Sequence, residues 1–226
     1  AAALIASPAN PTGTLIADEE LRKIHQEVTK RGGSLIMDEI YQGLTYDSVP
    51  NTALSILNQT DNVFVVNSFS KYFHMTGWRL GWMVVPKAYV KEIETLAQNL
   101  FISPSTPAQY AAMAAFLPET MEILEARRCE LNRRRDFLVP ALEAVNFRVP
   151  AKPGGAFYVY ADTSAVAEDS FRLSSTLLAA AHVAMTPGRD FGVNRPERYM
   201  RIAYTQPIAR LEKAVDRIHR SLITGG

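Results

Sequence analysis

Three short apolar segments, residues 3–7, 34–37 and 62–67, each run directly into polar residues. Short segments of this kind are typical of strands buried in a parallel sheet. Between the first two, apolar residues recur at helical spacing, from an expected N-cap at Asp18 to the glycines at 32–33. Because strands that alternate with helices form parallel βαβ units, the sequence predicts an α/β fold with a mostly parallel sheet.

The second half of the chain follows a different pattern. A long charged helix is predicted from Pro118 to about Val145, and short strands and helices are mixed after it. The predicted strands are residues 147–149, 157–160, 183–185 and 200–204, and the predicted helices are residues 170–181 and 207–222. We therefore expect residues 1–117 to be part of a large domain, and residues 118–226 to form a linking helix and a smaller α+β domain.

Charge and composition exclude several classes of partner. The formal net charge is +1, which argues against nucleic acid or a membrane surface as the main partner. The run Arg133-Arg134-Arg135 is interpreted as a solvated face of the long helix. Cys129 is the only cysteine, so no intrachain disulfide can form, which suits a reducing compartment such as the cytoplasm.

The beginning of the chain indicates a missing upstream portion. It opens at Ala1 without a methionine and enters a strand-like segment within a few residues. We therefore expect an N-terminally incomplete chain, in which the large domain lacks part of its sheet.

Polar side chains follow each of the three predicted strands. Asn10 comes after the first strand, Asp38 ends the second with Tyr41 shortly beyond it, and Ser68 and Lys71 follow the third. In an open parallel sheet, ligands bind beyond the carboxyl ends of the strands. These residues are therefore expected to gather at one edge of the sheet.

The residue types at this edge suit one kind of chemistry. The Lys71 amine can form a Schiff base with an aldehyde. The hydroxyls of Ser68 and Ser70 and the guanidinium of Arg79 can hold a phosphate, and Asp38 can pair with a protonated ring nitrogen. The set predicts a phosphate-bearing aldehyde as cofactor and requires no metal.

Several motifs, in this order, resemble one enzyme family. The chain is similar to the class I and II aminotransferases of fold type I, which depend on pyridoxal 5'-phosphate, from about residue 5 to residue 222. The motifs are Asn10-Pro11-Thr12-Gly13, Asp38-x-x-Tyr41, Ser68-x-Ser70-Lys71, Arg79, Pro153-Gly154-Gly155-Ala156-Phe157-Tyr158, Thr186-Pro187-Gly188-x-x-Phe191-Gly192 and Arg201.

The resemblance implies a role for each site residue. Lys71 carries the Schiff base and then moves the proton between the substrate α-carbon and the cofactor. Arg201 holds the substrate α-carboxylate, with Asn10 beside the substrate. The residues implied to bind the cofactor are Asn10, Asp38, Tyr41, Ser68, Ser70, Lys71 and Arg79.

The implied activity is transfer of an amino group between an L-amino acid and a 2-oxo acid, within amino acid metabolism and biosynthesis. The resemblance also implies a homodimer in the complete protein. Two alternatives stay open from the sequence. One is a carbon–sulfur lyase, decarboxylase or cyclopropane-carboxylate synthase of the same fold, and the other is the cofactor-sensing domain of an aminotransferase-like transcription regulator.

Overall fold

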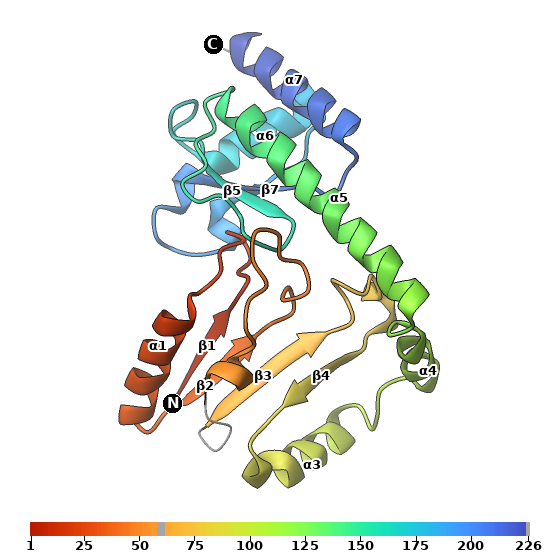
Figure 1. Cartoon of the computed structure of the whole chain (residues 1–226). Coiled ribbons are helices and arrows are strands. Elements are labelled where there is room, and N and C mark those ends of the chain that lie inside the picture. Colours follow the sequence, from red (N-terminus) through yellow and green to blue (C-terminus); the bar gives the residue numbers. More distant parts are fainter. Residues whose placement is uncertain (58–61, 225–226) are drawn as a thin grey trace. The chain divides into compact units, whose positions relative to one another are not determined.

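The computed structural model describes residues 1–57 and 62–224, whose secondary structure divides between two units (Figure 1). Unit 1 consists of Ala1–Ala9 and Leu15–Arg128, and unit 2 of Asn10–Thr14 and Cys129–Gly226. The change from unit 1 to the second part of unit 2 falls inside helix α5 (Pro118–Glu143). The domain division at residues 117 and 118 stays a prediction.

Unit 1 is built on a four-stranded sheet with the order β1-β2-β3-β4. Strands β1 (Ala2–Ala6), β2 (Ser34–Asp38) and β3 (Val63–Ser68) are parallel, whereas β4 (Gly81–Val84) runs antiparallel to β3. The expected α/β fold with a mostly parallel sheet is confirmed.

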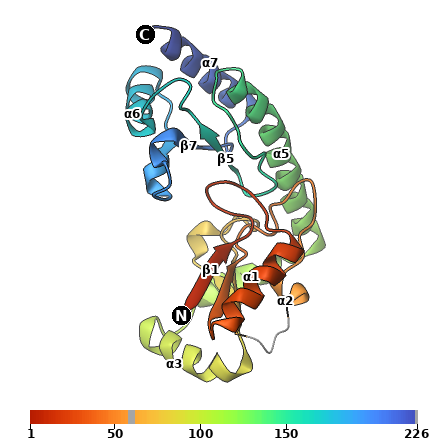
Figure 2. The ribbon, with the colours of Figure 1, turned by 90° about the vertical axis from the view of Figure 1, so that its left-hand side faces the viewer.

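The core of unit 1 lies between this sheet and two helices. Helices α1 (Asp18–Lys30) and α2 (Ala53–Ile56) lie on the same side of the strands (Figure 2). One face of the sheet is buried with them, and its core residues are Leu21, Leu35, Met37, Ala53, Leu57, Val63 and Val65. The alternate residues Ile36 and Phe64 face the other way and are only half-buried, as the two-residue period of a strand requires.

The start of α1 corrects one prediction. Its N-cap is Ala17 rather than Asp18, and no side chain caps the helix. Asp18 is the first helical residue, and its carboxylate accepts a hydrogen bond from the Asn51 side-chain amide at 2.7 Å. Three acidic residues in the first turn, Asp18, Glu19 and Glu20, stabilise the positive end of the helix dipole in place of a cap.

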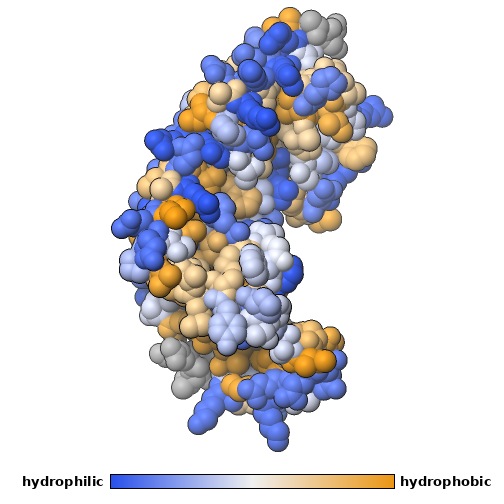
Figure 3. Space-filling model, turned by 90° about the vertical axis from the view of Figure 1, so that its right-hand side faces the viewer, coloured by the Kyte–Doolittle hydropathy of each residue, from blue (hydrophilic) through white to orange (hydrophobic). Residues whose placement is uncertain are grey.

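The short 3-10 helix η1 (Thr76–Trp78) precedes β4, and a second one, η2 (Lys87–Tyr89), follows it. Helices α3 (Val90–Leu100) and α4 (Thr106–Ala114) come next. In and just beyond these two helices, large apolar side chains are exposed. They are Leu96, Leu100, Phe101, Ile102, Tyr110, Met113, Phe116 and Leu117. Hydrophobic patches are visible on the face shown in Figure 3. Among the described residues, no helix is both long enough and apolar enough to cross a membrane.

Unit 2 holds a three-stranded antiparallel sheet with the order β5-β7-β6. Its elements after α5 are β5 (Tyr158–Asp162), α6 (Ser170–Ala181), β6 (Thr186–Pro187), η3 (Gly188–Asp190), η4 (Pro196–Arg198), β7 (Tyr199–Ala203) and α7 (Ile208–Thr224). Two predicted strands are wrong. Residues 183–185 precede the short edge strand β6, and residues 147–149 contribute only an isolated bridge between Arg148 and Asp162.

The two faces of the unit 2 sheet differ in composition. One face carries the apolar residues Val159, Ala161, Met200 and Ile202, all buried. The opposite face carries Tyr158, Tyr160, Tyr199 and Arg201, because side chains alternate along each strand. The apolar face builds the core, and the other face is the one that presents a charge.

The arginine run in α5 is not the uniformly solvated face that its sequence suggests. Arg135 is only 1% exposed, and its guanidinium donates to the carbonyl oxygen of Pro153 at 2.9 Å and pairs with Asp136. Arg133 remains exposed, as predicted. A buried guanidinium needs such partners to offset its loss of hydration, so Arg135 fixes the Pro153 loop against α5.

Asp162 is the second buried charge of unit 2 and gives a prediction on pH. Burial alone would raise the pKa of this carboxyl. Hydrogen bonds from the Ser164 hydroxyl and backbone N–H and from Arg198 outweigh that effect and lower the pKa to about 2. Because the value in the unfolded chain is near 3.8, ionised Asp162 stabilises the fold above that pH, and the contribution is lost as the pH falls through 2.

We expect Asp162→Asn to lower the free energy of unfolding at pH 7 by about 2 kcal/mol. The difference from the wild type should narrow steadily below pH 4. Urea unfolding at several pH values measures this, with the exposed Asp216→Asn on α7 as a control that should change little. A deficit for Asp162→Asn that is the same at pH 7 and pH 3 would contradict the prediction.

Candidate functional site

The carboxyl ends of β2 and β3 bring two predicted site residues to the same edge of the unit 1 sheet. Asp38 is the last residue of β2 and pairs in register with Val66, two residues before Ser68 at the end of β3. Asp38 Oδ1 accepts the backbone N–H of Ile40 at 3.0 Å, which fixes the carboxylate as the chain turns. No other partner of the Asp38 carboxylate is found within the described part of the chain.

Lys71 lies in a tight turn directly after β3. The turn is closed by hydrogen bonds from the N–H of His74 to the Lys71 carbonyl and from the N–H of Met75 to the Phe69 carbonyl. Buried Phe69 anchors it through ring contacts with Phe73, Trp82 and Phe116. The amine of Lys71 is thus carried on a rigid support, with its Nζ 5.8 Å from the centre of the buried Tyr41 ring.

The residue after Lys71 ties this turn to helix α5. The Tyr72 hydroxyl donates to Glu125 at 2.6 Å, and burial together with this bond raises the pKa of Tyr72. Glu125 in turn accepts from Arg128, whose guanidinium donates to the Thr45 carbonyl at 2.8 Å. The Tyr72 ring leaves no room for a side chain at Gly43, where an added Cβ would lie 2.6 Å from it. The network holds the two loops that carry Tyr41 and Lys71.

The predicted phosphate-binding residues form two groups in unit 1. The backbone N–H of Ser70 donates to Ser68 Oγ at 3.0 Å, and the two hydroxyl oxygens lie 2.9 Å apart. Arg79 is exposed and has the left-handed φ of 54°, and its guanidinium donates to the Thr76 carbonyl at 2.9 Å. The Thr76 hydroxyl donates to the Ser70 carbonyl at 2.6 Å, which links the two groups through one turn.

Glu39, next to Asp38, has a structural role, as the sequence suggested. It is buried, and its carboxylate accepts the N–H of Ala53 at 2.7 Å and the Thr52 hydroxyl at 2.9 Å. Burial raises the pKa of Glu39, and the two hydrogen bonds partly offset that rise. Glu39 therefore fixes the start of α2, whereas Asp38 lies at the edge of the sheet.

Asn10 and Arg201 belong to unit 2, and the structure brings them together. Arg201 Nη1 donates to Asn10 Oδ1 at 2.8 Å, and Nη2 lies 3.4 Å from the hydroxyl of Thr186 on the neighbouring strand. Two aromatic rings, of Tyr158 and Phe191, lie 4.3 and 4.5 Å from the guanidinium carbon. Half-buried Arg201 makes no ion pair with any acidic residue of the described ranges.

Two of the sequence motifs also meet in unit 2. The Gly13 carbonyl accepts the N–H groups of both Gly154 and Gly155, at 3.0 and 2.9 Å. Gly13 has a φ of 67°, and a Cβ there would lie 2.6 Å from Pro153. Only glycine fits this approach, and the contact fixes the loop that carries Asn10.

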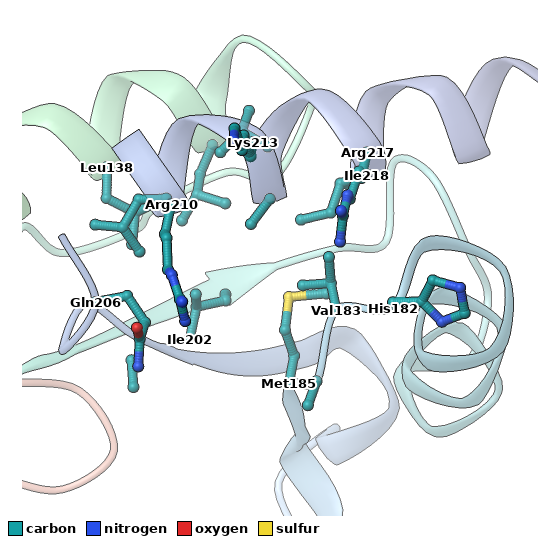
Figure 4. Close-up of a pocket in the computed structure, with 16 residues that line it drawn as sticks. Leu138, His182, Val183, Met185, Ile202, Gln206, Arg210, Lys213, Arg217 and Ile218 are labelled. Carbon is teal, nitrogen blue, oxygen red and sulfur yellow. The ribbon is translucent and has the colours of Figure 1, made fainter. Parts of the chain in front are cut away.

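A cavity of about 480 Å³ lies elsewhere in unit 2, between α5, α7 and β7. Most of the residues that line it are apolar, and Figure 4 shows Arg210 and Arg217 extending into it from α7. These two residues are seven positions apart, which places them on one face of the helix. None of the predicted site residues lines this cavity, so it is distinct from the candidate site.

The surroundings of Arg201 were not predicted from the sequence. Tyr158 and Phe191 belong to motifs quoted above, but their contact with Arg201 depends on which strands pair. Antiparallel pairing of β5 with β7 sets Tyr160 opposite Arg201 and Tyr158 on the same face. The only signal in the sequence is the alternation of aromatic residues along β5, which does not identify the partner strand.

Comparison with known proteins decides the family. A family model described as "Aminotransferase class I and II" matches residues 2–218. The chain belongs to this family. It is 40% identical over 215 residues to the valine–pyruvate aminotransferase of Mycobacterium tuberculosis, a match that covers 95% of this chain and 55% of that protein. It is 33% identical over 223 residues to the aspartate aminotransferase of Pyrococcus abyssi, covering 98% of this chain and 57% of the relative.

Solved structures of aminotransferases share the fold. One from Mycobacterium tuberculosis superposes with a TM-score of 0.93 at 39% identity, covering 99% of this chain and 57% of the other. The structure of the aspartate aminotransferase of Thermus thermophilus with maleate superposes with a TM-score of 0.89 at 33% identity. The match covers 97% of this chain and 56% of that one. The fold-type I class is confirmed, and the chain spans little more than half the length of these aminotransferases.

The structural role of Glu39 can be tested by comparing its removal with the removal of an exposed glutamate. Glu39→Ala removes the acceptor of the Ala53 N–H and the Thr52 hydroxyl, so we expect the free energy of unfolding to fall by about 1–3 kcal/mol. Glu20→Ala removes an exposed partner of Lys23 and should cost under about 0.5 kcal/mol. Denaturant unfolding of both variants measures the difference, and equal effects would contradict the assignment.

Proposed function

We propose that the protein is a pyridoxal 5'-phosphate-dependent aminotransferase that moves an amino group between an L-amino acid and a 2-oxo acid. Family membership supports this proposal, as do the names of the relatives. The chain's own contribution to the argument is the charge of Arg201, which no acidic side chain of the described residues pairs.

Arg201 is the observation that carries the proposal. It is a half-buried cation whose contacts within the described residues are an amide, a hydroxyl and two aromatic rings. A cation in such surroundings normally has a carboxylate partner, because loss of hydration is costly. A guanidinium fork matches a carboxylate in two hydrogen bonds. The α-carboxylate of an amino acid or 2-oxo acid would supply the missing anion.

The donor set of unit 1 suits pyridoxal 5'-phosphate. Asp38 has a carboxylate oxygen that accepts no hydrogen bond from a described residue, and it could pair with the protonated pyridine nitrogen. The paired hydroxyls of Ser68 and Ser70 and the exposed guanidinium of Arg79 would bind its phosphate. When bound, the cofactor accepts the electron pair released at the substrate α-carbon.

Each residue then has a proposed task. Lys71 would hold the cofactor covalently through Nζ and later carry the α-proton as general base and acid. Tyr41 and Asn10 would donate hydrogen bonds to the ring oxygen of the cofactor, and Asn10 would also lie beside the substrate. Arg201 would orient the substrate by its carboxylate. The rigid turn around Lys71 supports this assignment, because proton transfer needs a fixed geometry.

The alternative functions are not favoured. A lyase, decarboxylase or synthase of the same fold would use the same cofactor residues, and a transcription regulator could retain them. The relatives described above are named aminotransferases, and none of those names is of another class.

Two further features belong to the proposal. We infer a homodimer, supported by the large apolar side chains exposed along α3 and α4, since patches of this kind mark protein interfaces. We also infer a cytoplasmic location, which suits a chain whose single cysteine, Cys129, is exposed.

The cofactor assignment predicts a spectroscopic result. Purified protein mixed with pyridoxal 5'-phosphate should develop a yellow absorbance band that withstands dialysis and bleaches when an amino donor is added. Lys71→Ala should lose the band, because Lys71 is the lysine carried by the turn directly after β3. Lys87→Ala, an exposed lysine near α3, is the matched control and should keep it. A band that persists in Lys71→Ala would refute the role of Lys71.

The reaction class predicts which products form. Amino group transfer yields one new amino acid for each 2-oxo acid consumed, whereas elimination releases ammonia. We expect equal amounts of the two transfer products and no ammonia, measured by chromatography after incubation with a panel of L-amino acids and pyruvate. Ammonia in proportion to substrate lost would favour the lyase alternative.

A further inference from the structure

The guanidinium of Arg201 lies close to two aromatic rings. Its central carbon is 4.3 Å from the ring centre of Tyr158 and 4.5 Å from that of Phe191. Both distances are within the range of cation–π attraction, which extends to about 6 Å. Each ring therefore both stabilises the charge and restricts where the side chain can move.

Two independent elements supply the rings. Tyr158 is on β5, on the same face as Arg201 of β7, because Tyr160 pairs directly with Arg201. Phe191 follows η3 and is held by its N–H bond to the Gly188 carbonyl at 2.9 Å and by an edge contact with Tyr160 at 6.1 Å. Tyr160 itself stacks on Tyr199 at 5.0 Å, so the rings form a packed row.

The guanidinium of Arg201 also makes two polar contacts. Asn10 and Thr186 already contact Nη1 and Nη2. The two nearby rings limit how the guanidinium can turn, and a planar carboxylate that meets the fork in its own plane can make two parallel hydrogen bonds. Arg201 is half-buried, and partial removal from water strengthens the attraction between the two charges.

We propose that Tyr158 and Phe191 are positioning residues that hold Arg201 for the substrate carboxylate. They act through the guanidinium, and therefore set carboxylate affinity while leaving cofactor binding unchanged. The inference rests on the proposed function, in which Arg201 binds that carboxylate.

The test measures carboxylate binding to the full-length, cofactor-loaded protein. Propanoate and 3-methylbutanoate, which lack an amino group, serve as probes, and calorimetry gives their dissociation constants. The variants are Phe191→Leu and Tyr158→Leu, with Phe191→Tyr and Tyr158→Phe as conservative controls that keep a ring. The cofactor absorbance band and its affinity are recorded for each variant, to show that the protein is folded.

We expect each leucine variant to weaken probe binding about three- to tenfold, as loss of one cation–π contact implies. The ring-keeping variants should bind nearly as the wild type does, and cofactor affinity should not change. In an Arg201→Gln background, Phe191→Leu should have no further effect on probe binding, because the ring acts only through the guanidinium.

Three results would overturn the inference in distinguishable ways. If Arg201→Gln weakens binding but neither leucine variant does, the rings do not position the arginine, and the proposed function stands. If Arg201→Gln leaves binding unchanged, or the wild type binds neither probe, the carboxylate role of Arg201 in the proposed function fails as well. If one leucine variant loses the cofactor band while its ring-keeping control retains it, that ring does not act through the guanidinium alone, and the inference fails for that residue.

Discussion

Parallel pairing of β1, β2 and β3 is the constraint on which unit 1 depends. Parallel strands all end at the same edge of the sheet, so residues that are distant in sequence become neighbours there. Asp38 and Ser68 close two adjacent strands, and the turn that carries Lys71 begins at once after the second. The apolar side of the same strands is buried against α1, so a slip in register that moved these residues would also expose the core.

In unit 2, the alternation of side chains along the central strand β7 sets where Arg201 lies. Met200 and Ile202 of β7 are buried in the core, while Arg201 between them faces the aromatic side of the sheet. A strand with one charged residue among buried ones is held in register by its neighbours. This makes the position of Arg201 as firm as that of the core itself, which suits a residue that must meet a ligand in a fixed orientation.

Local features of the sequence were sufficient to predict the fold class and to place Asp38, Ser68 and Lys71 at or just beyond the carboxyl ends of β2 and β3, since each follows or ends an apolar segment. What failed depended on distant contacts. Arg135 looked solvated because its partner, the Pro153 carbonyl, lies 18 residues away along the chain. The strand expected at 183–185 formed instead at Thr186–Pro187, where β7 offers a partner. The rings around Arg201 depend on which strands pair and could not be read from spacing.

The loop Asn10–Thr14 packs with unit 2, although both flanking segments belong to unit 1. The chain therefore crosses between the units after Ala9, after Thr14 and again within α5 after Arg128. Neither unit is encoded by one uninterrupted stretch of the gene. A single proteolytic nick in α5 would therefore leave the Asn10 loop on the fragment that holds unit 1, separated from the unit with which it packs.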